Sequence, residues 1–121
     1  MVQIKIKRVY EPAMPEDGYR VLVDRLWPRG CKKEALKLDE WNKQIAPSAA
    51  LRKFFNHDKE YFELFKMRYK DELEFQHSEL LRLLSLAEKR PVTLLYAAKE
   101  GMVNHAIVLY EVLQSLVNKV K

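Results

Sequence analysis

The 121-residue sequence is poor in the residues that crosslink or interrupt a chain, with one cysteine, three glycines and five prolines. A single cysteine, Cys31, excludes an internal disulfide and fits a reducing compartment. The few glycines and prolines exclude a low-complexity chain. No apolar run approaches the roughly 20 residues that a membrane span needs, and the first residues alternate in polarity, unlike a signal peptide. We therefore expect a cytoplasmic protein with no membrane contact.

Length and composition are those of a globular domain. With 48% hydrophobic and 32% charged residues in 121, we expect one domain spanning residues 1–121. The net charge of +5 permits an anionic ligand or nucleic acid, but there is no run of five or more basic residues and hence no basic arm. The histidines lie far apart, without the spacing of paired ligands, so we expect no metal site.

Apolar patterning predicts strands over 2–10, 20–23 and 92–96. Helical spacing predicts further elements, namely helices over 35–45, over 49–55 with Ser48 as N-cap, from Asp58 onward, over 78–89 and over 104–117. Strands separated by helices need crossover connections, which makes the pairing at least partly parallel. We predict an α/β fold, a small three-layer sandwich with a short, mostly parallel three-stranded sheet and about five helices.

Polar residues stand where each predicted strand ends. Arg8 belongs to the end of the first strand, and Asp24 and Arg25 follow the second. Tyr96 ends the third strand on the way to Lys99. In parallel α/β sheets, ligands bind beyond the carboxyl ends of the strands. We therefore expect these side chains to converge on one edge of the sheet.

Several cations would surround one carboxylate at that edge. Arg8, Arg25 and Arg29 carry guanidinium groups, which bind phosphate or carboxylate through two parallel hydrogen bonds. Asp24 would orient these arginines or act as a general base. The competing interpretation is an Asp–Arg network that only ties the strand ends together, and the sequence leaves both interpretations open.

The segment after the third predicted strand adds candidates to the same edge. Asn104 is a favoured N-cap, and the free N–H groups that begin a helix attract anions. His105 would stand in the first turn, where a neutral imidazole can act as acid, base or donor. Tyr96, Lys99 and Trp27 complete the predicted substrate contacts. The alternatives are that Asn104 is only a cap, that His105 only packs, and that Trp27 is a half-buried packing residue.

Residues 7–10 (Lys-Arg-Val-Tyr) and 17–30 (Asp-Gly-Tyr-Arg-Val-Leu-Val-Asp-Arg-Leu-Trp-Pro-Arg-Gly) resemble the YeaO-like branch of domain-of-unknown-function family 488. The resemblance continues in order through Trp41, 46–48, 94–99 and 104–106. It implies a bacterial or archaeal, cytoplasmic α/β protein without an established activity. Other branches have Cys-His-Arg where this sequence has Asn-His-Ala. The resemblance to those branches therefore extends to Asp24, Arg25 and His105, but it implies no thiol mechanism for this sequence.

These patterns favour a pocket for a small anion at the strand ends. If the protein is an enzyme, Asp24 and His105 would be catalytic, in hydrolysis or group transfer on a small anionic substrate. The alternative is a nucleic-acid or protein-interaction module that uses a basic surface. A third hypothesis is a domain whose Asp–Arg cluster is only a brace. The sequence indicates no cofactor and no oligomeric state.

Overall fold

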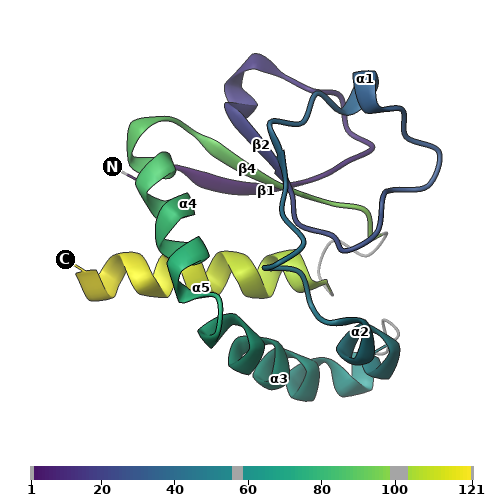
Figure 1. Cartoon of the computed structure of the whole chain (residues 1–121), viewed down its shortest axis with the longest axis vertical. Coiled ribbons are helices and arrows are strands. Elements are labelled where there is room, and N and C mark those ends of the chain that lie inside the picture. Colours follow the sequence, from purple (N-terminus) through teal and green to yellow (C-terminus); the bar gives the residue numbers. More distant parts are fainter. Residues whose placement is uncertain (1, 56–58, 99–103, 121) are drawn as a thin grey trace.

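The computed structural model describes residues 2–55, 59–98 and 104–120. The elements follow one another in the order β1 (Ile4–Arg8), η1 (Pro15–Asp17), β2 (Tyr19–Leu22), α1 (Lys33–Leu36), β3 (Glu40–Trp41), α2 (Ala49–Phe55), η2 (Lys59–Tyr61), α3 (Phe62–Glu74), α4 (His77–Lys89), β4 (Val92–Tyr96) and α5 (His105–Val120). The α and β elements form one α/β unit (Figure 1).

The sheet consists of four parallel strands in the order β1-β4-β2-β3. In register, Arg8 of β1 lies opposite Tyr96 of β4. Leu22 of β2 lies opposite both Leu95 of β4 and Trp41 of β3. The prediction of parallel pairing is confirmed, and the carboxyl ends of all four strands therefore meet at one edge of the sheet.

The two faces of the sheet carry cores of different size. On one face, alternate strand residues pack against α2, α3, α4 and α5 in a large apolar cluster (Figure 1). On the other face, Leu22 and Leu95 pack with Leu36 of α1, and Trp27 lies against them. A helical layer thus covers one face, whereas the short helix α1 and the irregular chain around it cover the other. The predicted α/β class with a parallel sheet is confirmed.

The long helices form where apolar periodicity predicts them. Phe65, Tyr69 and Leu73 recur every four residues along α3 and are buried. α4 begins at His77, one residue before the predicted start, and α5 begins at His105 and extends past the predicted end. The predicted cap Asp58 lies outside the described residues.

The fourth strand corrects the prediction of a three-stranded sheet and of a helix over 35–45. Only the short α1 is helical in this region, and it ends where Lys37 adopts a left-handed conformation, with φ 47° and ψ 49°. The next segment then pairs with β2, because the Asp39 N–H donates to the Arg20 carbonyl and the Asp39 carboxylate accepts from the Arg20 N–H. These two contacts with Arg20, one from the Asp39 backbone and one from its side chain, favour a strand where the apolar spacing alone favours a helix.

Candidate functional site

Asp24 and His105 meet at the carboxyl edge of the sheet. Asp24 Oδ2 accepts a hydrogen bond from the Ala97 N–H at 2.9 Å. His105 Nε2 lies 2.9 Å from the Val23 carbonyl oxygen and 3.0 Å from Asp24 Oδ1. Because both neighbours of Nε2 are acceptors, Nε2 carries a hydrogen. That hydrogen is directed at Val23, so Asp24 Oδ1 is buried without a hydrogen bond from any described residue.

The first turn of α5 holds His105 at this edge. The Asn104 side-chain oxygen accepts a hydrogen bond from the Ile107 N–H at 3.2 Å, which satisfies one of the N–H groups that begin the helix. Asn104 is fully buried. The predicted N-cap is confirmed, and it places His105 at the first helical position.

The Tyr69 ring packs against the His105 ring. The two rings pack edge to face with centroids 6.2 Å apart, and the Tyr69 hydroxyl donates to the Ile45 carbonyl. Burial, together with the negative charges of Glu72 and Asp24, raises the pKa of the Tyr69 phenol well above its usual range. The phenol therefore stays neutral and acts as a hydrogen-bond donor.

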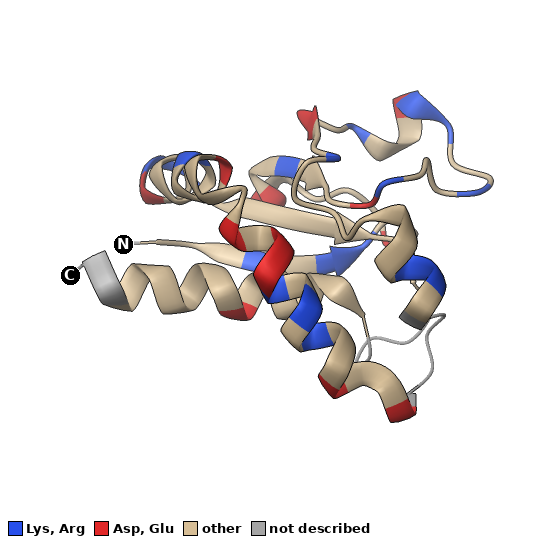
Figure 2. Ribbon diagram, turned by 60° about the horizontal axis from the view of Figure 1, so that its bottom comes forward, with Lys and Arg blue, Asp and Glu red and all other residues tan. Residues whose placement is uncertain are grey.

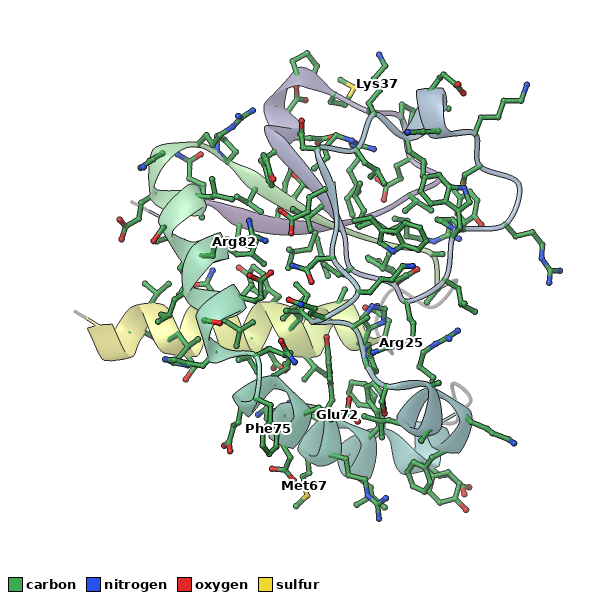
Figure 3. The ribbon with its side chains drawn as sticks, viewed as in Figure 1. Arg25, Lys37, Met67, Glu72, Phe75 and Arg82 are labelled. Carbon is green, nitrogen blue, oxygen red and sulfur yellow. The ribbon has the colours of Figure 1, made fainter. Side chains whose placement is uncertain are left out.

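Hydrogen bonds hold the segment that leads into α2 against α3. Ser48 caps α2 as predicted, because its hydroxyl oxygen accepts a hydrogen bond from the Leu51 N–H at 3.1 Å. Glu72 extends from α3 towards this segment and accepts hydrogen bonds from the Ser48 N–H at 2.9 Å and hydroxyl at 2.6 Å (Figure 3). α2 and α3 are thereby joined.

Two arginines are anchored beside this edge. Arg25 lies between the sheet and α2 (Figure 3), and its Nε donates to the Pro47 carbonyl at 2.9 Å. Arg8 Nε donates to the Ala98 carbonyl at 2.9 Å, and its guanidinium lies over the Tyr10 ring at 5.1 Å. Neither arginine has an ion-pair partner among the described residues. Arg25 also donates through Nη2 to the Ala46 carbonyl at 3.5 Å. Both guanidinium groups are thus held by backbone carbonyls, and no carboxylate among the described residues forms an ion pair with either one.

The other predicted ligand contacts have different surroundings. Trp27 Nε1 donates to the Cys31 carbonyl at 2.8 Å, and its ring packs against the smaller core. Tyr96 is buried in the larger core, and this burial raises the pKa of its phenol. Arg29 is exposed in the turn after Trp27. Lys99 lies outside the described residues.

Trp41 reaches the edge from β3, where the sequence predicts part of a helix. Its Nε1 donates to the Asp24 carbonyl at 2.7 Å, and the Lys43 ammonium lies 4.1 Å from its ring centroid. Trp41 is 36% exposed. The contact depends on the short strand β3, which no local sequence pattern indicates.

A second aspartate, Asp17, forms a separate cluster over the face with the smaller core. Lys5, Thr93 and Arg20 pair with one another across β1, β4 and β2 and so form one row of the sheet. Arg20 Nη1 lies 2.5 Å and Lys5 Nζ 3.2 Å from the Asp17 carboxylate. Lys7 adds a third ion pair at 2.9 Å, and the Thr93 hydroxyl donates to the Asp17 carbonyl at 2.7 Å. The sequence predicts Asp17 only as a turn residue, although polar residues alternating along β1 were a signal for this row.

The chemical groups at the carboxyl edge are two fixed guanidinium groups, an imidazole N–H and one carboxylate. Guanidinium groups recognise phosphate and carboxylate. Within residues 2–55, 59–98 and 104–120, no group of three or more His, Cys, Asp or Glu side chains is placed to hold a metal ion. None of the helices in the described part of the chain is long and apolar enough to cross a membrane.

Comparison with known proteins places the chain in a family. A family model with the description "Inactive DUF488-N3 subclade" matches residues 3–121. The chain is 51% identical over 115 residues to "Uncharacterized protein YeaO" of Escherichia coli, covering 95% of this chain and all of that protein. An uncharacterized protein of Mycobacterium tuberculosis is 39% identical over 111 residues, covering 92% of this chain and 93% of its own length. No solved structure gives a significant match. The resemblance inferred from residues 7–10 and 17–30 is confirmed, and the chain belongs to the YeaO-like DUF488-N3 family, in the subclade described as inactive.

Proposed function

We propose that the chain binds a small anion, carrying a phosphate or carboxylate group, at the carboxyl edge of its sheet. The observation that carries this proposal is the anchoring of Arg8 and Arg25, each through Nε to a backbone carbonyl 2.9 Å away and without an ion-pair partner among the described residues. A guanidinium fixed in advance loses less rotamer entropy when it binds. Two such cations at the strand ends make the edge attractive to an anion.

In this proposal Asp24 positions the site and does not contact the anion. Its Oδ2 accepts a hydrogen bond from the Ala97 N–H, and its Oδ1 lies 3.0 Å from His105 Nε2. One side chain therefore joins the end of β2 to the end of β4 and the start of α5. Removing Asp24 would loosen the edge, whereas removing Arg8 or Arg25 would remove the charge that recognises the ligand.

Binding without turnover is the form of the proposal that we favour. The family model that matches the chain describes its subclade as inactive. A general acid or base must reach the reacting atom, and here His105 Nε2 donates to Val23 while Asp24 Oδ2 accepts from Ala97. Hydrolysis or group transfer through Asp24 and His105 stays a prediction, which the experiment below also addresses.

The distribution of charge favours a small ligand over a broad basic surface. Both α3 and α4 carry Lys and Arg together with Asp and Glu (Figure 2). Nucleic acid is bound by a contiguous basic face, and the affinity then falls steeply with salt. Mixed charges along the helices do not form such a face.

Inorganic phosphate is the probe for this proposal, followed by NMR titration of backbone amides. We expect saturable shifts at Asp24, Ala97 and His105. Arg25→Gln and Arg8→Gln should each weaken binding roughly tenfold, since a hydrogen bond to a charged group contributes about 1.5 kcal/mol.

Arg90→Gln is the matched control. The Arg90 guanidinium lies 5.6 Å from the Tyr19 ring centroid, beside the amino end of β4, and the substitution should leave phosphate binding unchanged. Absence of saturable shifts, or equal binding in all three variants, contradicts the proposal. If the protein hydrolyses a phosphate monoester and His105→Gln does not, binding without turnover is the wrong form and the catalytic prediction is the right one.

A further inference from the structure

A hollow of about 200 Å³ lies between α3, α4 and α5, and none of its lining residues belongs to the carboxyl edge. Its floor is apolar and its rim is charged or polar. The floor is made by Leu73, Leu80, Val112 and Leu116, and the rim by Lys70, Glu74 and His77. An apolar hollow with a polar rim is the form of a site that takes an apolar anchor.

Phe75 lies in the chain between two rim residues of this hollow, Glu74 and His77. It follows Glu74 at the end of α3 and is 86% exposed, more than any other large apolar residue that the structure describes. Its ring points away from the sheet, as Figure 3 shows. Burying a phenylalanine side chain contributes about 1.5 to 3 kcal/mol, a gain that the single chain does not make.

The hollow and the ring match in size. An apolar cavity of about 150 Å³ takes up benzene, so a hollow of about 200 Å³ has room for a phenyl ring. Phe75 does not line its own hollow. We propose that the chain forms a two-fold symmetric homodimer in which Phe75 of each copy enters the hollow of the other. A two-fold interface uses the same patch on both copies, and an anchor beside its own receptor forms such a patch.

The charges on the rim are also self-complementary. Lys70 and Glu74 are exposed and lie one turn apart on the same face of α3. Neither forms an ion pair within the described part of the chain. Across a two-fold axis, Lys70 of one copy would face Glu74 of the other, and the pair would occur twice.

The surface that α3 and α4 offer to a second copy is suited in size to a dimer that dissociates on dilution. A stable interface takes about 800 Å² from each partner, or about a tenth of the 7633 Å² accessible surface of the chain. α3 and α4 contain 13 residues each, about 20 Å of helix. Leu81, one turn beyond His77 on α4 and 38% exposed, extends the apolar part of this surface. The dimer is independent of anion binding.

Light scattering on the purified chain over a wide range of concentration tests the dimer. The wild-type mass should rise from 14.4 kDa towards twice that value as the concentration increases. Phe75→Asp should stay at the monomer mass with an unchanged circular dichroism spectrum. Met67→Asp is the matched control, because Met67 is also on α3 and 65% exposed but does not line the hollow, and it should dimerise as the wild type does.

A charge exchange tests the two-fold pairing. Lys70→Glu and Glu74→Lys should each weaken the dimer, and the double variant should restore it. A wild type that stays monomeric at every concentration overturns the proposal, and so does a Phe75→Asp dimer as tight as the wild type. If the chain is monomeric and toluene shifts the NMR signals of Leu80 and Leu116, the hollow takes a small apolar ligand and the dimer is wrong.

Discussion

Two aspartates stand at the two ends of β2, and their surroundings differ. Asp17 precedes the strand, and its carboxylate contacts three cations and accepts a hydrogen bond from one backbone N–H. Asp24 follows the strand, and only one of its carboxylate oxygens accepts a hydrogen bond from a described residue. The side chain of Asp17 is 1% exposed and that of Asp24 is 14% exposed. Burial is therefore similar, and the difference lies in the number of partners.

This difference fits our proposal, in which Asp17 stabilises the fold and Asp24 positions the anion site. Burial alone would raise the pKa of Asp17, but the hydrogen bonds from Met14, Lys7 and Lys5 outweigh burial and hold that pKa well below its usual value. A buried network with all its members paired makes the structure rigid. A buried oxygen that accepts no hydrogen bond from a described residue, such as Asp24 Oδ1, departs from the general rule, and such departures concentrate at functional sites.

The largest expected effect is the loss of the Asp17 charge. Asp17→Asn leaves the side chains of Lys7 and Arg20, 12% and 5% exposed, without their shared counter-ion. Breaking a buried pair in this way is strongly destabilising, by about 3 to 5 kcal/mol. Urea unfolding at neutral pH should show a loss of that size.

Lys5→Gln is the control within the same cluster. Lys5 contacts the same carboxylate but is 46% exposed, so its ion pair is screened by water and should contribute less than about 1 kcal/mol. If Lys5→Gln and Asp17→Asn destabilise the protein equally, the cluster acts through something other than buried charge.

Acid unfolding measures in a second way how much the Asp17 carboxylate contributes to stability. Because folding lowers the pKa of Asp17 below its usual 3.8, its contribution is fully present above that pH and is lost as the pH falls from there towards the folded value. The wild type should therefore lose stability more steeply than Asp17→Asn below about pH 4. The pKa values of Glu40 and Glu79 are also lowered, but both proteins share these groups, so the difference isolates Asp17. Parallel acid curves contradict the prediction.

Gly18→Ala disturbs the Asp17 cluster without changing its charge. Gly18 has φ 65°, and a Cβ atom there would lie 2.2 Å from the Pro91 carbonyl oxygen, which accepts the Tyr19 N–H at 2.8 Å. With ψ −125°, this positive-φ conformation is strained for a residue with a Cβ, by about 1 to 3 kcal/mol, and the collision adds to this. We expect urea unfolding to show a loss of about 2 to 3 kcal/mol. Alanine at exposed Gly30, with φ 77° and no neighbour within 4 Å, is the control for the backbone term alone.

The same comparison explains which parts of the fold can be predicted from sequence. β4 is predicted to the residue because its residues are all buried and Pro91 marks the boundary before it. β3 is missed because it has two residues and depends on contacts of Asp39 with Arg20, 19 residues away. Local periodicity carries no information about such contacts, and the apolar spacing over 35–45 therefore predicts a helix where a strand forms.

The part of the candidate site that follows from the order of the strands could be predicted from the sequence. Asp24 and His105 lie close together because one follows β2 and the other begins the helix after β4, and these strands are parallel neighbours. The anchoring of Arg8 and Arg25 on the carbonyls of Ala98 and Pro47 could not be predicted, because it depends on where two irregular segments pass. Irregular segments lack the periodicity on which such predictions depend.

The smallest expected effect is that of Asp24→Asn. The amide oxygen can keep the hydrogen bond to the Ala97 N–H, and the substitution removes a buried negative charge whose Oδ1 lacks a hydrogen bond from a described residue. The contact with His105 is lost, so we expect a net loss of about 1 kcal/mol or less in urea unfolding. Phosphate binding should persist, because Arg8 and Arg25 keep their anchors. A loss as large as that of Asp17→Asn would instead make Asp24 a structural brace, and the contrast between the two ends of β2 would then be wrong.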